Sequence, residues 1–157
     1  MQISWQYLAG FLDGEGSIGT TRTGKLRNVV GRVTIANTDH AILELIKSQF
    51  GGTITRRERG NKPGWRPFCS ISWTNRSALS LLEGVLPYLI LKRAQAELCI
   101  QLIRMKDQPK SERCVFVHTP TRGFPSRILA RISPEVQAAE QAIAMQIKEM
   151  NRKGVPI

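Results

Sequence analysis

Two carboxylates, Asp13 and Glu15, follow a short apolar segment in the stretch YLAGFLDGEGSI, residues 7–18. The apolar residues before them recur at three-to-four spacing, which predicts a helix that ends near the acidic pair. A helix C-terminus carries a partial negative charge, so it is an unfavourable place for two acids. Carboxylate oxygens suit Mg²⁺ or a similar hard divalent cation, which would relieve the repulsion. The alternative is that both carboxylates are ordinary solvent-exposed side chains at the end of the helix.

Gly10 and Gly14 have the spacing of small residues that allows two helices to approach closely. If two copies of this helix pack at a two-fold axis, their acidic C-termini lie side by side and can share cations. Glycine at positions 14 and 16 would also let the backbone approach an ion and turn directly into a strand. The residues expected at this dimer interface are Leu8, Gly10, Phe11 and Gly14.

The charge balance indicates a polyanionic partner. The 157 residues include 23 Lys and Arg against 12 Asp and Glu, for a net charge of +11 and a pI near 10.3. Nucleic acid is the usual partner of such a chain, and an anionic membrane surface is a less frequent one. No segment approaches the roughly 18 apolar residues of a membrane span. Three widely spaced cysteines, Cys69, Cys99 and Cys114, indicate a reducing compartment without a disulfide framework or zinc site. We therefore expect a soluble intracellular protein.

Helical and β-rich segments alternate along the chain. Helices are expected at about residues 4–13, 38–50, 77–89 and 91–106, with hairpins at 16–37 and 52–75 that turn around Gly24 and within 60–64. This α-β-β-α-β-β-α order fits an α+β fold with one antiparallel sheet of four strands and helices on a single face. Residues 107–127 look like a basic loop, and 133–154 predict a final helix capped by Ser133. We expect a core of residues 1–107, with residues 108–157 as a basic loop and helix of the same domain.

The two hairpins combine an apolar face with a basic, hydroxyl-bearing one. Val29, Val33 and Ile35 alternate with Arg32 and Thr34 in the second strand of the first hairpin. A two-stranded ribbon fits the major groove of B-DNA, where such side chains contact bases and phosphates. An ordinary solvated sheet face is the alternative, which the same bias in both hairpins disfavours. The expected DNA contacts are Arg22, Lys25, Arg27, Asn28, Arg32, Thr34, Arg56, Arg57, Arg59, Lys62, Arg66, Ser70 and Ser72.

The stretch LAGFLDGEG, residues 8–16, closely resembles the LAGLIDADG motif of homing endonucleases. The α-β-β-α-β-β-α order is also that family's core, with a saddle-shaped sheet. The stretches NTDHAILELIKSQFGGTI and LPYLILKRAQAEL resemble the family's following segments, so that the resemblance covers about residues 5–105.

The resemblance implies roles for particular residues. Glu15 matches the acidic position that binds divalent metal at the scissile phosphates, Gly14 the position whose carbonyl helps to coordinate it, and Asp13 the first acidic position, which mainly supports the helix end and interface. Lys92 matches the basic residue near the active-site water and phosphate, and Gln95 lies one turn further on. The family's solvent-organising glutamine has no clear counterpart in TIANTDHA, where Asn37 is the only polar substitute.

The resemblance further implies a homodimer, because the chain has one motif, and a metal-dependent DNA endonuclease that uses Mg²⁺ or Mn²⁺. Such a dimer, at about +22 (2 × 11), would bind a long, partly palindromic double-stranded target with marked salt dependence. It would hydrolyse a phosphodiester bond in each strand. Two alternatives remain: an RNA-splicing maturase that binds intron RNA, and a DNA-binding protein of the same fold that does not cleave. The expected location is the cytoplasm or nucleoid, or an organelle.

Residues 110–157 lie outside the resemblance. The stretch KSERCVFVHTPTRGFPSR carries Arg113, Arg122 and Arg127 with few acidic neighbours, so it is either a further DNA-contacting arm or a basic surface loop. The final helix, with Ile143, Ile147 and Met150 on one side, is expected to serve packing.

Overall fold

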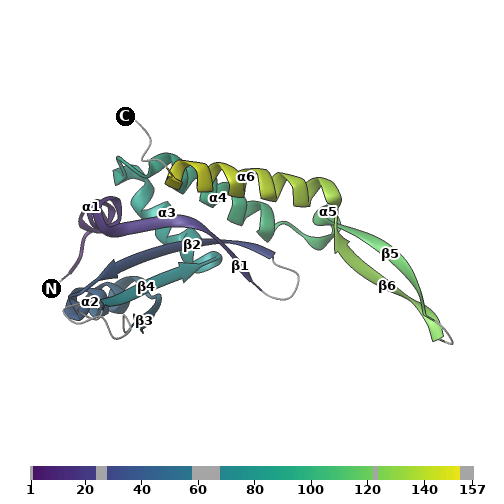
Figure 1. Cartoon of the computed structure of the whole chain (residues 1–157), viewed down its shortest axis with the longest axis horizontal. Helices are drawn as coiled ribbons and strands as arrows, with labels where there is room; N and C mark the ends of the chain where they lie inside the picture. The colour runs from purple at the N-terminus through teal and green to yellow at the C-terminus, as the bar shows by residue number, and fades with distance from the viewer. Residues whose placement is uncertain (1, 24–27, 58–67, 122–123, 153–157) are drawn as a thin grey trace.

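The computed structural model describes residues 2–23, 28–57, 68–121 and 124–152 (Figure 1). Its helices are α1 (Trp5–Glu15), α2 (His40–Phe50), α3 (Arg76–Val85), α4 (Arg93–Asp107), α5 (Lys110–Arg113) and α6 (Pro134–Arg152), with a 3₁₀ turn, η1 (Leu86–Tyr88), between α3 and α4. Its strands are β1 (Gly16–Thr23), β2 (Asn28–Asn37), β3 (Thr53–Arg57), β4 (Phe68–Thr74), β5 (Cys114–Thr121) and β6 (Phe124–Ile132). The two hairpin turns expected around Gly24 and at residues 60–64 lie outside these described residues.

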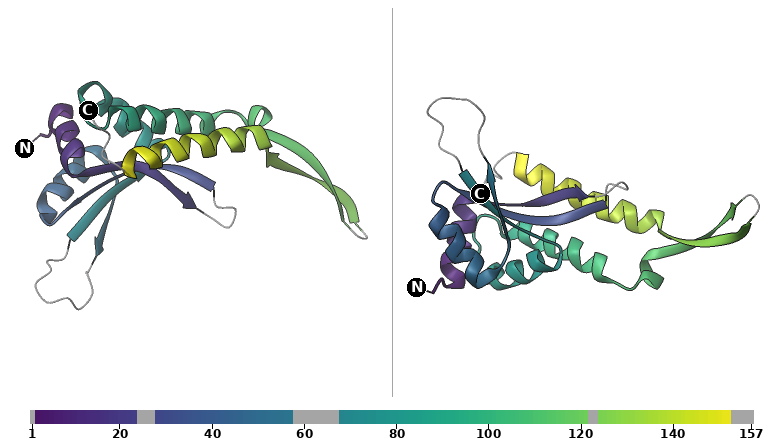
Figure 2. Two further views of the ribbon diagram at one scale, coloured as in Figure 1. Left: turned by 45° about the horizontal axis from the view of Figure 1, so that its top comes forward. Right: turned by 90° about the horizontal axis from the view of Figure 1, so that it is seen from below.

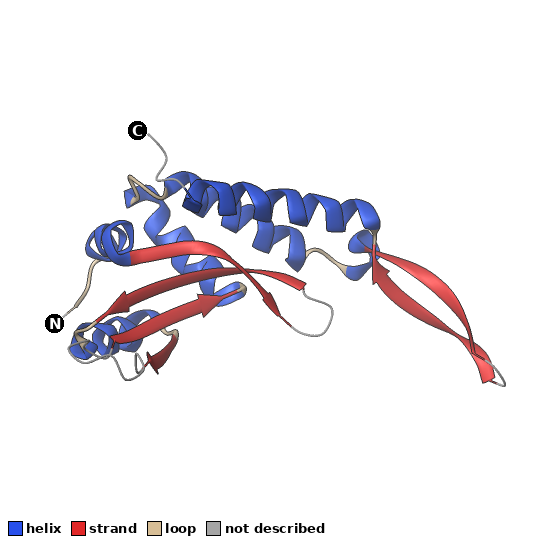
Figure 3. Ribbon diagram, viewed as in Figure 1, coloured by secondary structure: helices blue, strands red, loops and turns tan. Residues whose placement is uncertain are grey.

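The first four strands form the expected α+β architecture. They make one antiparallel sheet in the order β1-β2-β4-β3, with Gly16 opposite Ile35 and Arg32 opposite both Gly19 and Thr74. Figure 3 shows α3, α4 and α6 on one side of this sheet, with α4 and α6 running side by side. The prediction of a four-stranded antiparallel sheet with an α+β element order is therefore confirmed.

The hydrophobic core lies between the sheet and the helices, and the alternation read from β2 and β4 decides which strand residues enter it. Val33, Ile35, Ile71 and Trp73 are at most 1% exposed, and the indole Nε1 of Trp73 donates to the carbonyl of Phe50 at the end of α2. Burial of apolar side chains contributes the larger part of the stability of such a layer.

Helix α4 packs closely on β2 because position 31 is glycine. A Cβ there would lie 2.8 Å from Ile103 and 2.9 Å from the Sγ of Cys99, which leaves no room for a side chain. Burial raises the pKa of the Cys99 thiol to about 11 and keeps it protonated. All three cysteines are free thiols.

Local hydrogen bonds and one glycine mark the ends of three helices. The Ser4 hydroxyl accepts a hydrogen bond from the backbone amide of Tyr7, and the Asp39 carboxylate accepts one from Ala41, as N-cap residues do. Gly51 ends α2 with a positive φ of 67°, a conformation that glycine adopts without strain. Ser133 caps α6 through the amide of Val136.

The prediction of a loop at residues 107–127 is wrong. The chain forms the short helix α5 and then a second, two-stranded antiparallel sheet of β5 and β6, which we call the hairpin arm (residues 114–132). Figure 2 shows the arm projecting away from the main body. Its prolines and central glycine are typical loop signals, but an isolated ribbon has two edges on which a missing amide is tolerated. The ladder is irregular between Thr119 and Thr121, on either side of Pro120. Within the described residues, no helix has the length and apolar character needed to cross a membrane.

Candidate metal centre and nucleic-acid interface

The end of α1 passes directly into β1 without a connecting loop. Glu15 is the last helical residue and Gly16 the first strand residue, and the Gly16 amide donates to the carbonyl of Leu12. A Cβ at position 16 would lie 2.6 Å from that carbonyl oxygen, so only glycine fits this turn. The turn thus places Glu15 directly before the first residue of β1, which is an edge strand of the sheet.

The carboxylate of Asp13 binds the segment that precedes α4. One oxygen accepts hydrogen bonds from the amides of Ile90 and Leu91, at 2.8 and 3.2 Å, and the other from the amide of Lys92, at 3.0 Å. Lys92 is the N-cap residue of α4, where the helix dipole favours a negative charge. The acid that is unfavourable at the end of α1 is therefore stabilised by the beginning of α4.

Lys92 makes the reciprocal contact, from its side chain to the backbone of Asp13. Its ammonium donates to the backbone carbonyl of Asp13, so that a cation compensates the C-terminal end of α1. Lys92 is half-buried, and its ammonium is bound two residues before Glu15 in the chain. Asp13 and Lys92 together join the end of α1 to the beginning of α4, the two segments that carry the predicted catalytic residues.

Glu15 remains available for a ligand. Its side chain is exposed, and no hydrogen bond or ion pair holds its carboxylate within the described part of the chain. Gly14 is also exposed, and a Cβ added to it would meet nothing within 4 Å. No group of three or more His, Cys, Asp or Glu side chains able to hold a metal occurs among the residues described. A cation at Glu15 would therefore need further oxygen ligands from outside the protomer.

The two other predicted catalytic side chains lie in different surroundings. Asn37 ends β2 at the same end of the sheet as Gly16, and its side-chain oxygen accepts from the amide of Asp39, which orients the turn into α2. Gln95 lies one turn into α4 and is only 8% exposed. Its side chain is therefore largely covered by the rest of the protomer.

One face of α1 consists of Tyr7, Gly10, Phe11 and Gly14, at helical positions i, i+3, i+4 and i+7. Tyr7 and the two glycines are exposed, whereas Phe11 is half-buried and packs partly against the core. The rings of Tyr7 and Phe11 stack with centroids 6.0 Å apart, and an added Cβ at Gly10 would meet nothing within 4 Å. The assignment of Leu8 to the interface is wrong: this side chain is fully buried in the core of its own protomer, on the opposite side of α1.

The sheet face opposite the core carries part of the predicted DNA contacts. Asn28, Arg32, Thr34 and Ser72 lie on this face; Asn28 is exposed and the other three are half-buried. Arg22 and Arg56 are exposed, but they lie directly opposite Val29 and Cys69, two buried core residues, so the register puts them on the core-facing side near the ends of β1 and β3. Ser70 is 7% exposed and its hydroxyl donates to the Thr55 carbonyl at 3.5 Å, so the structure removes Ser70 from the contact set. Arg57 ends β3. The predicted contacts Lys25, Arg27, Arg59, Lys62 and Arg66 lie outside the described residues.

Arg32 is the notable side chain of this face. Its Nε is buried and has no hydrogen-bond partner in the described structure. A buried donor without a partner costs stability.

Two features of this region were not predicted from the sequence. Tyr7 belongs to the exposed face of α1, and its i, i+7 spacing from Gly14 is the signal that would have found it. Ile90 and Leu91, 84% and 56% exposed, form an apolar surface beside Asp13. They were overlooked because the stretch LILK reads as the beginning of a buried helix.

Comparison with known proteins finds DNA endonucleases among the proteins similar to this chain. No protein-family model matches the chain. It is 37% identical over 111 residues to DNA endonuclease I-CvuI from Chlorella vulgaris, a match that spans 66% of this chain and 65% of that protein, slightly less than two thirds of its length. Its fold is similar to a crystal structure of the homing endonuclease I-CvuI in complex with its target in the presence of Ca, with a TM-score of 0.68, 26% identity, and coverage of 93% of this chain and 80% of the other. It is similar in fold alone to the archaeal intron-encoded homing endonuclease I-Vdi141I complexed with DNA (TM-score 0.65, 14% identity, 92% of this chain and 82% of that one).

Proposed function

We propose that this chain belongs to the LAGLIDADG homing endonuclease family and that it is a site-specific, metal-dependent endonuclease of double-stranded DNA. The observation that carries the proposal is the joining of α1 to α4 by Asp13 and Lys92, which leaves the carboxylate of Glu15 exposed at the end of a basic sheet. Such a carboxylate, next to an ammonium and a surface of positive charge, suits a phosphodiester substrate.

The active form in this proposal is a homodimer. Gly10 and Gly14 give the protomer no packing benefit, because among the described residues no atom lies within 4 Å of a Cβ added to either. Glycine in a helix costs up to about 1 kcal/mol relative to alanine, so two of them on one exposed face are best explained by a closely packed second helix. Two α1 helices that meet on this face bring two Glu15 residues together and supply ligands that one protomer lacks.

A divalent cation, which we propose to be Mg²⁺, would be held by Glu15 and the carbonyl of Gly14, together with phosphate oxygens of the DNA. These are hard oxygen donors of the kind that Mg²⁺ and Ca²⁺ prefer. When bound, the ion would lower the pKa of a coordinated water and stabilise the charge of the leaving oxygen. In this assignment Asp13 is not a ligand, because both of its oxygens are occupied by backbone amides.

The residues of the chain itself have three tasks in the reaction. The basic and hydroxyl-bearing face of the sheet binds and orients the duplex, with Arg32 as a phosphate or base contact. Arg22 and Arg56, which are exposed near the ends of β1 and β3, add positive charge beside that face. Glu15 fixes the position of the reacting phosphate relative to the protein. Lys92, whose orientation Asp13 determines, supplies positive charge next to the phosphate as negative charge develops in the transition state.

Incubation of the purified protein with Mg²⁺ and a library of randomised duplexes, followed by sequencing of the cleaved ends, tests the proposal. We expect cleavage at one long, partly palindromic sequence, with no product in the presence of a chelator. Binding of duplexes without cleavage in any divalent metal would indicate a DNA-binding protein of this fold instead. Absence of binding to any duplex would reject the proposal.

A further inference from the structure

The hairpin arm is the part of the molecule that the proposed active site does not use. Its two strands form a sheet separate from the four-stranded one, and Figure 2 shows it extending past the ends of α4 and α6. Val115 and Phe116, near its base, are 44% and 62% exposed although both are apolar. An isolated two-stranded ribbon is marginally stable in water. An arm of this kind is therefore expected to have a partner in the functional complex.

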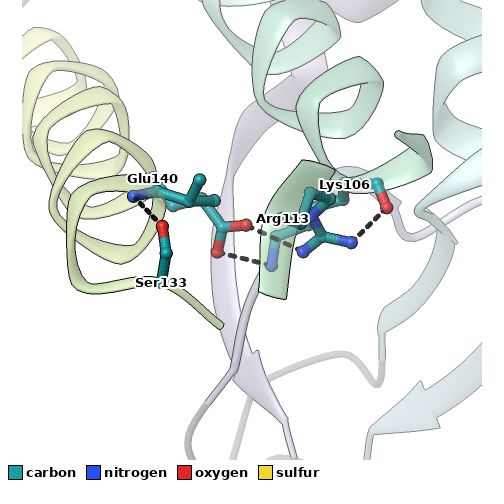
Figure 4. A network of polar contacts seen from close by, with 5 residues as sticks. Lys106, Arg113, Ser133 and Glu140 are labelled. Atoms are coloured by element: carbon teal, nitrogen blue, oxygen red, sulfur yellow. Dashed lines mark hydrogen bonds and ion pairs between the residues drawn. The ribbon is translucent and has the colours of Figure 1, made fainter. Parts of the chain in front are cut away.

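The base of the arm is firmly attached to the helices (Figure 4). The carboxylate of Glu140, 4% exposed, accepts from the ammonium of Lys106 at 2.8 Å and from the guanidinium of Arg113 at 3.0 Å, and Arg113 also donates to the Lys106 carbonyl. The amide of Ser133 donates to the Arg113 carbonyl at 2.8 Å. Breaking a buried ion pair typically costs about 3–5 kcal/mol, so this network fixes where the arm leaves the body.

The arm begins where the predicted DNA face ends. A cleft of about 530 Å³ is lined by Asn28 and Thr74 from the sheet and by Arg113 and Ile132 from the base of the arm. Asn28 begins β2 opposite Thr23, the last residue of β1, whereas Glu15 lies at the other end of these strands. The arm thus begins beside the end of β1 and β2 that is distant from α1 and from the proposed dimer axis.

The charge of the arm matches that of the sheet. No acidic residue occurs between Glu112 and Glu135, a stretch that contains four arginines. One of these, Arg113, is neutralised by Glu140. Arg131 is exposed, and Arg127 lies four residues before it on β6, at a register position opposite Thr119. Alternation along a strand puts positions 127 and 131 on the same face of the ribbon.

We propose that the hairpin arm contacts the phosphate backbone of the duplex outside the segment that the four-stranded sheet covers, and so lengthens each half-site. This inference rests on the proposed function. The eight residues of β5 extend about 26 Å at roughly 3.3 Å per residue, the length of about eight base pairs of B-DNA. Contacts from arginines to phosphates add affinity and fix orientation, but they carry no base sequence.

A shortened arm tests the proposal. Phe116 lies directly opposite Ala130, so residues 117–129 can be replaced by Asn-Gly, which closes a two-residue hairpin turn and keeps the network of Lys106, Arg113 and Glu140. The probe is the cleaved target sequence with random flanks, and the readouts are the hydroxyl-radical footprint, the salt dependence of binding and cleavage at saturating protein. We expect the footprint to lose several base pairs at each outer end, with the central cleavage position unchanged.

A second variant removes charge without removing the ribbon. Arg127→Ala/Arg131→Ala should lower the slope of log K against log salt by about 1 for each phosphate that the protein no longer neutralises, up to about 4 in a dimer. The matched control, Arg93→Ala/Arg104→Ala, removes two exposed arginines from the helix layer, where they pair with Glu97 and Glu83, and should leave the footprint unchanged.

Three outcomes would overturn the inference. A footprint and salt slope unchanged in both arm variants would exclude a DNA contact. A shortened protein that sediments as a monomer where the parent is a dimer would identify the arm as a contact between copies. If Arg93→Ala/Arg104→Ala changed the footprint and the salt slope as much as Arg127→Ala/Arg131→Ala, the change would result from net charge alone. Each of these leaves cleavage by the parent protein intact, whereas failure of the parent to bind or cleave any duplex would reject the proposed function itself.

Discussion

The carboxylate of Asp13 and the ammonium of Lys92 bind each other's backbone rather than each other's side chain. Asp13 accepts the Lys92 amide at 3.0 Å, together with the amides of Ile90 and Leu91, while the Lys92 ammonium donates to the Asp13 carbonyl. Each charge lies at the helix end of opposite sign, the carboxylate at the beginning of α4 and the ammonium at the end of α1. The exchange connects segments 79 residues apart in the sequence and explains why a basic chain keeps an acid at position 13.

Asp13→Asn should loosen this connection while leaving the fold intact. An amide oxygen is a weaker acceptor than a carboxylate, so we expect the free energy of unfolding to fall by about 1–3 kcal/mol. Because Lys92 would be less well oriented, the cleavage rate at saturating DNA should fall roughly 10- to 100-fold, as is typical of residues that orient a catalytic group. Chemical denaturation and single-turnover cleavage measure the two effects. Asp107→Asn, which removes an exposed acid that pairs with Arg76, is the control, and equal effects in both variants would contradict the positioning role.

Glu15→Gln should separate binding from cleavage. The substitution removes one negative charge from an exposed side chain that holds no partner among the described residues, so stability and duplex affinity should stay within a few-fold of the parent. The cleavage rate should fall by about a thousandfold or more, since the metal would lose its carboxylate ligand. Glu97→Gln, which breaks an exposed pair with Arg93 on α4, is the matched control. Normal cleavage by the Glu15 variant would remove this residue from the mechanism.

Gly10→Ala should stabilise the protomer and weaken the dimer. The added Cβ meets no atom within 4 Å in the part of the chain that the structure describes, and alanine is favoured over glycine in a helix by about 1 kcal/mol. Against a closely packed second helix, the same methyl group would cost about 1–3 kcal/mol, or roughly 10- to 100-fold in association. Sedimentation across a concentration series measures the weaker association, and thermal unfolding measures the gain in stability of the protomer.

Gly84→Ala provides the contrast to this prediction. A Cβ at position 84 would overlap the ring of Trp5, which packs against α3 in the same protomer. This variant should lose stability without a specific effect on association. If Gly10→Ala leaves the dimer unchanged, the exposed face of α1 is not the interface.

Arg32→Met tests the outer face of the sheet. Methionine keeps the apolar stem of the side chain but removes a buried Nε that lacks a partner in the described structure, so stability should be equal or higher. If the guanidinium contacts DNA, affinity should fall and the slope of log K against log salt should decrease by about 1 per protomer. Arg104→Met, on the helix layer, is the control and should change neither. A parent-like slope for Arg32→Met would exclude a phosphate contact at this position.

Local patterns in the sequence were sufficient for the elements of the four-stranded core, and they drew attention to the acidic pair at the end of α1. Alternation in β2 and β4 identified the buried face, because side chains on a strand point to opposite sides at every second residue. Ser133 was expected to cap the final helix and does so, because a cap is satisfied by residues within one turn. The strand-to-helix order then left few arrangements for one antiparallel sheet. The motif at residues 8–16 singled out Glu15 and the glycines for the same reason: its members are neighbours in the chain.

Only the tertiary structure decided the parts that depend on contacts between distant segments. It placed Leu8 in the core and Tyr7 on the surface, because the direction in which α1 faces is set by the sheet beneath it. It also showed that the Asp13 carboxylate accepts from the backbone amides of residues 90–92, a contact that no local pattern encodes. It also turned an apparent loop into the hairpin arm, because pairing between β5 and β6 and the buried Glu140 network outweigh the local preference of proline and glycine for irregular chain. Short-range preferences determined the elements of the core, whereas packing determined the hairpin arm and the exposure, partners and position of the site residues.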